Sequence, residues 1–222
     1  MAIDMRSVSA AELSVLETNK VLKNTYLLLS ATLGFSALTA LFSMSLNIGG
    51  MMPLIMILGA MALGIFVLPK TANSAAGIGM IFLITGMLGF AIGPMLGMYL
   101  NLSNGPQLVL TALGGTAAIF VGLSAYAVNS KKDFSFMGGM LIAGVITVFV
   151  LMLANLFLKM PGFQLIISGF VIMLMSGFIL MDTSRIVLGG ETNYIMATYG
   201  MYLSIFNIFI HLLAILGIMS ED

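Results

Sequence analysis

The sequence contains no cysteine, no tryptophan, one histidine and few charges. Without cysteine the chain has no disulfide, no thiolate zinc site, no iron–sulfur cluster and no thiol nucleophile. A single histidine excludes a multi-histidine metal cage, so we expect no bound metal and no cofactor. Charged residues make up 7% of the 222 residues, and eight basic residues balance eight acidic ones. The chain therefore has no net field to attract a nucleic acid, and we expect no nucleic-acid partner.

Apolar residues take the place of the missing charges, at 60% of the chain. A charge at the centre of a bilayer costs at least about 2.5 to 3.5 kcal/mol, so charged residues mark the loops of a membrane protein. Because a span needs about 20 residues, the two longest charge-free stretches each contain more than one span. The charge-free stretches are 24–69, 71–130, 134–158, 160–181 and 192–220.

Turn residues divide the two long stretches at residues 47–50 and 101–106, where Asn, Gly, Ser and Pro interrupt the apolar run. This gives an all-α membrane protein with seven transmembrane helices. We place the helices at 25–46, 52–69, 76–99, 107–128, 134–158, 163–183 and 194–218. The domain organisation is then a cytoplasmic tail at 1–24, a seven-helix domain at 25–218 and an outer tail at 219–222.

The basic residues favour one orientation of these spans. With the N-terminus inside, only Lys159 lies on the outer side, and all other basic residues lie on the inner side. Cytoplasmic loops are enriched in Lys and Arg, so we predict a cytoplasmic N-terminus and a periplasmic C-terminus. The inner residues are Arg6, Lys20, Lys23, Lys70, Lys131, Lys132 and Arg185.

The N-terminal tail contains a capping-box pattern at residues 9–12, which predicts a short interfacial helix starting at Ser9. This helix leads into the first span. Alternatively, the tail is a cytoplasmic handle for a partner. The candidate handle residues are Ser9, Glu12, Glu17 and Lys20.

Four glycines form a stripe in the third span. Gly86, Gly89, Gly93 and Gly97 are spaced by three, four and four residues, which places them on one helix face. Small residues in this pattern let two helix backbones approach closely. We expect the stripe to serve helix packing within the chain.

The few polar residues inside the spans are the remaining candidates. Ser204, Asn207 and His211 lie on one face of the seventh span, which we expect to point inward. This face either satisfies interior hydrogen bonds or responds to protons or ions. Asp182 and Arg185, at the inner end of the sixth span, either form an ion pair across one turn or place a carboxylate at the mouth of a cavity.

Ser124 and His211 form a candidate catalytic pair, because Ser124 follows a glycine by two residues and His211 offers a base. From their positions in the fourth and seventh spans, they lie about 14 Å apart along the membrane normal. Proton transfer needs about 3 Å. We therefore predict that the chain is not an enzyme.

Several segments of the sequence, from about residue 17 to the end, resemble the Bax inhibitor family. Two of them, residues 189–195 and 202–207 (YLSIFN), are most similar to its bacterial YccA-like branch. The segments that carry the family resemblance are 20–26 (KVLKNTY), 124–126 (SAY), 131–139 (KKDFSFMGG), 182–184 (DTS) and 189–195 (GGETNYI).

This resemblance implies a seven-helix bundle wrapped around a central seventh helix in the bacterial cytoplasmic membrane. It further implies a partner, the membrane AAA protease FtsH, which such proteins bind and restrain from degrading membrane proteins, such as components of the protein-export channel. Some family members are instead pH-sensitive calcium leaks that use two carboxylates. Asp182 matches the first of these, but Ser204 stands at the place of the second, and a calcium or proton leak is the alternative function.

Overall fold

The computed structural model describes residues 10–46, 48, 50–158 and 160–220, with side chains described from Thr18 onward except at Pro161. Within these ranges every regular element is a helix, which confirms the all-α prediction. The helices are α1 (Ala10–Ser45), α2 (Met52–Ala62), η1 (Leu63–Val67), α3 (Leu68–Thr71), α4 (Ala75–Leu100), α5 (Gly105–Ser130), η2 (Ser135–Met137), α6 (Gly138–Leu158), α7 (Pro161–Val187) and α8 (Tyr194–Ser220).

Seven of the described helical segments are long and apolar enough to cross a membrane, as predicted. Their ends lie within a few residues of the predicted ends, except at the first span. There the helix predicted to lead into the first span is continuous with it, because α1 runs without a break from Ala10 to Ser45. Ser9 lies outside the described residues.

The second span is irregular because it contains Pro69. Proline has no N–H, and its ring clashes with the carbonyl group four residues earlier in a regular helix. The five-residue π-helical turn η1 comes directly before α3, and the N–H of Leu68 donates to the carbonyl of Leu63. This turn joins α2 and α3 into one continuous span.

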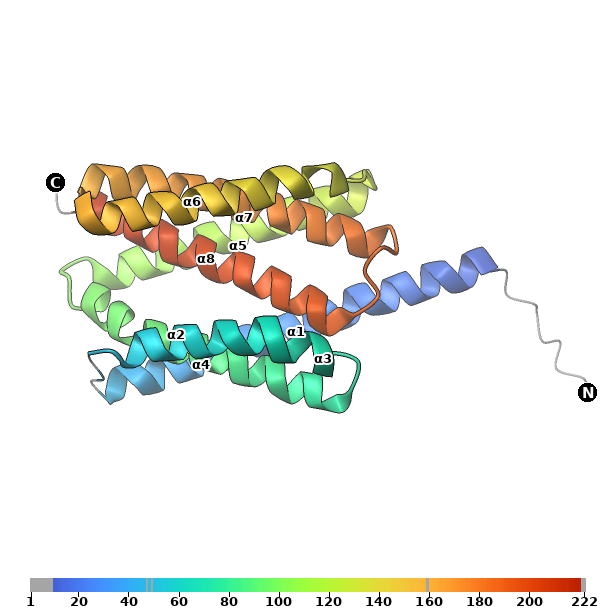
Figure 1. Cartoon of the computed structure of the whole chain (residues 1–222), viewed down its shortest axis with the longest axis horizontal. Coiled ribbons are helices and arrows are strands. Elements are labelled where there is room, and N and C mark those ends of the chain that lie inside the picture. Colours follow the sequence, from blue (N-terminus) through green and yellow to red (C-terminus); the bar gives the residue numbers. More distant parts are fainter. Residues whose placement is uncertain (1–9, 47, 49, 159, 221–222) are drawn as a thin grey trace, which may run out of the picture.

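The helices form two layers with α8 between them (Figure 1). One layer contains α1, α2 and α4, and the other contains α5, α6 and α7. Because α8 contacts α1, α4, α5 and α7, it is the central helix of the bundle. This confirms the central seventh helix that the family resemblance implied.

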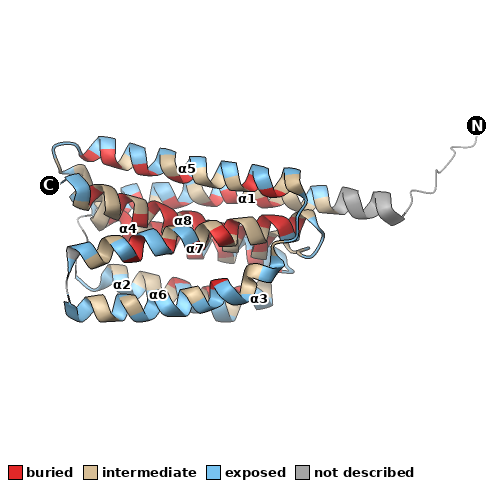
Figure 2. Ribbon diagram, turned by 90° about the horizontal axis from the view of Figure 1, so that it is seen from above, coloured by how far each residue is buried: buried red, intermediate tan, exposed pale blue. Residues whose placement is uncertain are grey.

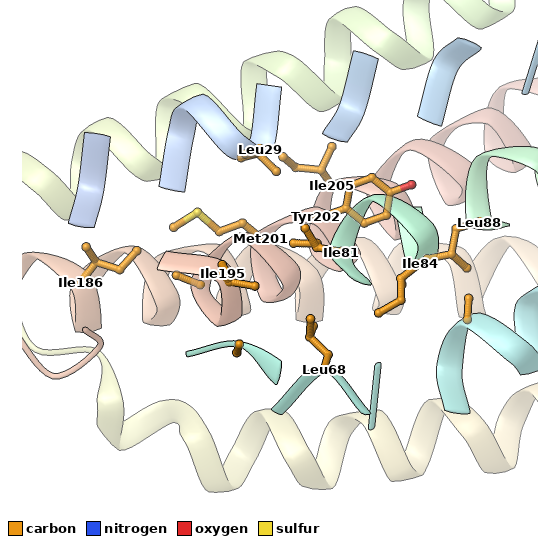
Figure 3. Close-up of a cluster of buried hydrophobic side chains, with 13 residues drawn as sticks. Leu29, Leu68, Ile81, Ile84, Leu88, Ile186, Ile195, Met201, Tyr202 and Ile205 are labelled. Carbon is orange, nitrogen blue, oxygen red and sulfur yellow. The ribbon is translucent and has the colours of Figure 1, made fainter. Parts of the chain in front are cut away.

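The largest buried cluster lies around the first half of α8. There Ile195, Met201 and Tyr202 meet apolar side chains of α1, α3 and α4, such as Leu29 and Ile81 (Figure 3). Buried positions are concentrated on α4 and α8, whereas α6 is exposed along much of its length (Figure 2). The exposed positions of α6 are mostly apolar, which suits a helix whose solvent is lipid.

Candidate functional site

Most of the segments that resemble the Bax inhibitor family meet at one end of the bundle. We call this the motif end; it carries the α3–α4 turn, the α5–α6 loop and the α7–α8 connection, and α1 projects beyond it (Figure 1). The opposite end, where α1 and α4 end, is the far end. The candidate functional site lies at the motif end.

The α5–α6 loop is tied to α7 by Ser184. The Ser184 hydroxyl donates to the Lys132 carbonyl (2.7 Å) and accepts from the Phe134 N–H (3.2 Å). One residue earlier on α7, Thr183 lies 3.5 Å from the hydroxyl oxygen of Ser124 on α5. The sequence motifs at 124–126, 131–139 and 182–184 are therefore parts of one contact.

Two local features shape the α5–α6 loop: a left-handed residue and a side-chain hydrogen bond. Lys131 adopts the left-handed conformation (φ 50°), which ends α5. Asp133 then accepts a hydrogen bond from the Ser135 N–H (2.8 Å), and this bond lowers the pKa of the exposed Asp133 carboxyl below its usual 3.8. The loop is thus ordered by its own backbone and side chains.

The α7–α8 connection owes its tight shape to Gly189, whose φ of +75° is a conformation that other residues rarely adopt. The N–H groups of Gly190 (2.8 Å) and Glu191 (3.0 Å) both donate to the Arg185 carbonyl and close the end of α7. Glu191 is thereby held beside the last turn of that helix.

Asn193 caps α8 and ties it to the other layer. Its side-chain oxygen accepts from the N–H groups of Ile195 (3.0 Å) and Met196 (3.1 Å), as a helix N-cap does. Its amide nitrogen donates to the Ala72 carbonyl (3.2 Å) and to Asn73 (2.7 Å) in the α3–α4 turn. The sequence prediction missed this residue, although an Asn directly before an apolar helix was a usable signal.

A small polar pocket of about 190 Å³ opens between the end of α7 and the start of α8. Asp182 is half-buried there, and its carboxylate lies against Gly200, where an added Cβ would come within 2.8 Å of the carboxylate oxygen. The absence of a side chain at Gly200 therefore makes room for the carboxylate. The pocket is lined by Asp182, Arg185, Glu191, Met196, Ala197, Tyr199 and Gly200.

Arg185 lines this pocket but remains exposed. Among the residues whose side chains are described, no N···O contact within 4.0 Å joins it to Asp182, so the predicted ion pair does not close, although the two opposite charges attract each other at longer range. The physical reason is that the Asp182 side chain packs on α8, while the Arg185 side chain is exposed at the surface. The second carboxylate lining the pocket is Glu191, which sequence reasoning did not select.

The other polar residues predicted on the seventh span do not join this pocket. The buried Ser204 hydroxyl donates to the Gly200 carbonyl (3.1 Å), and the half-buried Asn207 amide donates to the Leu203 carbonyl (2.8 Å). His211 is eleven residues from Gly200, about 16 Å along α8. Its ring nitrogen Nδ1 lies 3.0 Å from the hydroxyl oxygen of Ser168 on α7. The structure thus separates His211 from Asp182, whereas Ser204 lies one turn of α8 beyond the Gly200 that the Asp182 carboxylate contacts.

The side chains at the motif end are suited to binding a charged partner. Two carboxylates and one guanidinium border the pocket, and no three His, Cys, Asp or Glu side chains gather as a metal site among the described residues. The hydroxyl–imidazole pair of Ser168 and His211 lies in the buried contact of α7 with α8, where Ser168 has no exposed surface. A hydroxyl in that position is not accessible to a substrate.

The glycine stripe on α4 packs against α1, except at its last member. Added Cβ atoms at Gly89 and Gly93 would collide with backbone carbonyls of α1, and one at Gly86 would come within 2.6 Å of the Phe35 ring. An added Cβ at Gly97 would meet nothing within 4 Å, so its inclusion in the packing stripe is wrong. The two helices no longer approach closely at that position.

The seven-span bundle with a central last helix defines a polytopic membrane protein without a visible catalytic centre among its described residues. A family model described as "Inhibitor of apoptosis-promoting Bax1" matches residues 18–221, and the chain belongs to this Bax inhibitor family.

Relatives of known sequence cover nearly the whole chain. The chain is 47% identical over 209 residues, 94% of each chain, to the "Modulator of FtsH protease YccA" of Escherichia coli K12. It is 52% identical over 207 residues, 93% of each chain, to an uncharacterized membrane protein of Vibrio cholerae. An uncharacterized protein of Pseudomonas aeruginosa is 42% identical over 206 residues, which cover 93% of this chain and 92% of the relative.

Proposed function

We propose that this chain is a multi-pass inner-membrane protein that modulates the membrane AAA protease FtsH by binding it. The observation that carries this proposal is the 47% identity, over 94% of both chains, to a protein named a modulator of that protease. The family match over residues 18–221 includes all seven candidate spans. We further propose that the chain restrains FtsH without catalytic chemistry of its own.

The arrangement of polar groups supports a binding role. Ser204, Asn207 and His211 each have a hydrogen-bonding partner inside the bundle, so they stabilise the fold. The motif end, in contrast, presents charged groups to the outside. The positive-inside bias supports a cytoplasmic position for this end, on the side where an AAA protease carries its ATPase ring.

The projecting part of α1 is the proposed cytoplasmic handle. Lys20 is exposed near the motif end, and the same continuous helix includes Glu12 and Glu17. Ser9, the other candidate of this group, precedes the described residues. We propose that the tail, residues 1–24, is reached by the protease separately from the membrane domain, residues 25–218, which provides the binding surface.

The test combines binding and turnover in cells. The tagged full chain is produced with FtsH and purified in mild detergent, and the half-life of a short-lived membrane substrate of the protease is measured with and without the chain. We expect FtsH to co-purify and the substrate half-life to lengthen. Absence of FtsH from the purified sample, together with an unchanged half-life, would contradict the proposal.

The calcium-leak alternative has less support. It needs two carboxylates facing each other from the sixth and seventh spans, whose coupled titration would gate an ion path. On α8 the corresponding position is Ser204, whose hydroxyl bonds to its own helix. Glu191 shares the pocket with Asp182, but it comes from the α7–α8 connection and not from a span.

A further inference from the structure

An apolar slot, separate from the polar pocket, lies in the far half of the bundle. It has a volume of about 460 Å³, within the range of about 300 to 1,000 Å³ of small-ligand sites. Its walls are α1, from Leu33 to Met44, and α5, from Val109 to Val121. Its floor is formed by α4 and α8. The slot follows the helix axes, because the lining residues of each wall recur at spacings of three and four.

The sequence leaves this slot open by placing small residues on its walls. Ala37 and Ala40 lie on α1 and Ala117 on α5, where larger side chains would close the gap. The three polar side chains that line the slot already have partners. Ser36 and Tyr202 share a hydrogen bond of 2.6 Å, and the Thr116 hydroxyl donates to the carbonyl one turn earlier (2.7 Å). The slot therefore favours a ligand without polar groups.

The length of the slot matches one leaflet of a bilayer. Its wall on α1 runs over the twelve residues from Leu33 to Met44, a rise of about 16 Å, and half of the hydrocarbon core is about 15 Å thick. Toward the motif end its lining stops at Leu33 on α1 and Val121 on α5, and Phe120 of this lining packs edge to face on Tyr26 (ring centroids 5.9 Å apart). A transmembrane helix of a partner crosses both leaflets, so it cannot follow a slot that ends at mid-depth.

The slot opens sideways between α1 and α5. Leu41, Leu113 and Val121 border it and are 60%, 50% and 61% exposed. In a membrane the neighbours of this opening are lipid chains. We propose that the slot binds one acyl chain of a glycerophospholipid from the far-end leaflet.

The headgroup of this lipid lies beside the α4–α5 loop. The exposed side chains Asn101 and Asn104 there are uncharged, and the sequence has no charged residue from 71 to 130. A headgroup at this position meets amides rather than basic residues. The site therefore takes a zwitterionic phospholipid and does not select an anionic one.

Native mass spectrometry of the full chain, released from mild detergent, tests the proposal directly. We expect the unmodified chain to retain one phospholipid, identified by its mass. Ala117→Phe fills the slot and should reduce retention by about tenfold, because excluding as few as two methylene groups from an apolar site lowers affinity by that factor. The matched control is Ala118→Phe, on the same helix, exposed and outside the slot lining, which should retain the lipid.

A second pair of variants repeats the test from the facing wall. Ala37→Phe should lose the lipid and Ala31→Phe, which is exposed on α1 outside the lining, should keep it. This pair decides the outcome if Ala117→Phe does not fold. Equal retention within both pairs, a free fatty acid in place of the phospholipid, or an unmodified chain without any bound lipid would overturn the proposal.

Discussion

Replacing Gly93 by alanine should destabilise the bundle, whereas the same change at Gly97 should not. A Cβ atom at Gly93 would lie 2.6 Å from the Ala40 carbonyl oxygen and 2.7 Å from the Ser43 Cβ, where ordinary contacts begin at 3.4 Å. The carbonyl is part of the α1 backbone and cannot rotate away. The two helices must therefore separate by about 0.8 Å at this point, and overpacking of this kind costs about 1 to 3 kcal/mol.

The Gly97→Ala control makes this magnitude measurable. Alanine raises helix propensity by up to about 1 kcal/mol relative to glycine, and this gain is common to both positions. The difference between the two variants therefore isolates the contact with α1. It corresponds to about a 5- to 160-fold change in the unfolding equilibrium constant.

Reversible unfolding of each variant in mixed micelles, followed by helical circular dichroism as the denaturing detergent is increased, gives this difference. The unmodified chain sets the reference. Equal stability of Gly93→Ala and Gly97→Ala would refute the argument that α1 and α4 approach closely at Gly93.

Four further predictions concern topology, ion flux, turnover and capping. A phosphatase reporter at the C-terminus should be active in the periplasm and a fluorescent reporter in the loop after Lys131 should fluoresce in the cytoplasm; the reverse pattern would contradict the charge-derived orientation. Ser204→Asp should increase calcium flux into proteoliposomes and make it more dependent on pH, because a second carboxylate adds a ligand and a coupled proton site; an unchanged flux would show that this position does not act with Asp182. Deletion of residues 2–18 should slow turnover by FtsH in a chase experiment while co-purification persists, and equal half-lives would argue against the tail as a handle. Asn193→Ala should lower the unfolding free energy by about 0.5 to 2 kcal/mol in the micelle assay, whereas Asn193→Asp should keep much of the cap; equal losses would assign the effect to the bonds with the α3–α4 turn.

The spans were predictable from the sequence because the cost of burying charge in a bilayer is large. Lys70, at the end of the second span, and the turn residues near Asn101 marked boundaries that the structure places within a few residues. The start of the first helix could not be predicted from charge, because a helix that contains Lys20 and Lys23 can extend beyond the membrane into water. Their charge sets where the membrane ends and does not set where the helix ends.

Contacts between helices were harder to predict than the helices themselves. The spacing of Gly97 is the same as that of Gly93, and only the crossing of α1 and α4 distinguishes them. Glu191 and Asn193 lie in a connection that follows the sixth span, and their roles depend on which turn of the other layer lies nearby. The apolar slot depends on the distance between α1 and α5, and the sequences of these two apolar helices do not indicate that distance.

The continuity of α1 has a mechanical consequence for the proposed encounter with an energy-driven protease. A force applied at the N-terminal end of α1 acts along the helix axis and loads its contact with α4 in shear, so the interactions along the interface resist together. A flexible joint at the membrane surface would instead let the first span be peeled away one turn at a time. If the protease pulls on this end as proposed, each pulling step has to overcome the close-packed α1–α4 interface as a unit, which favours stalling over extraction.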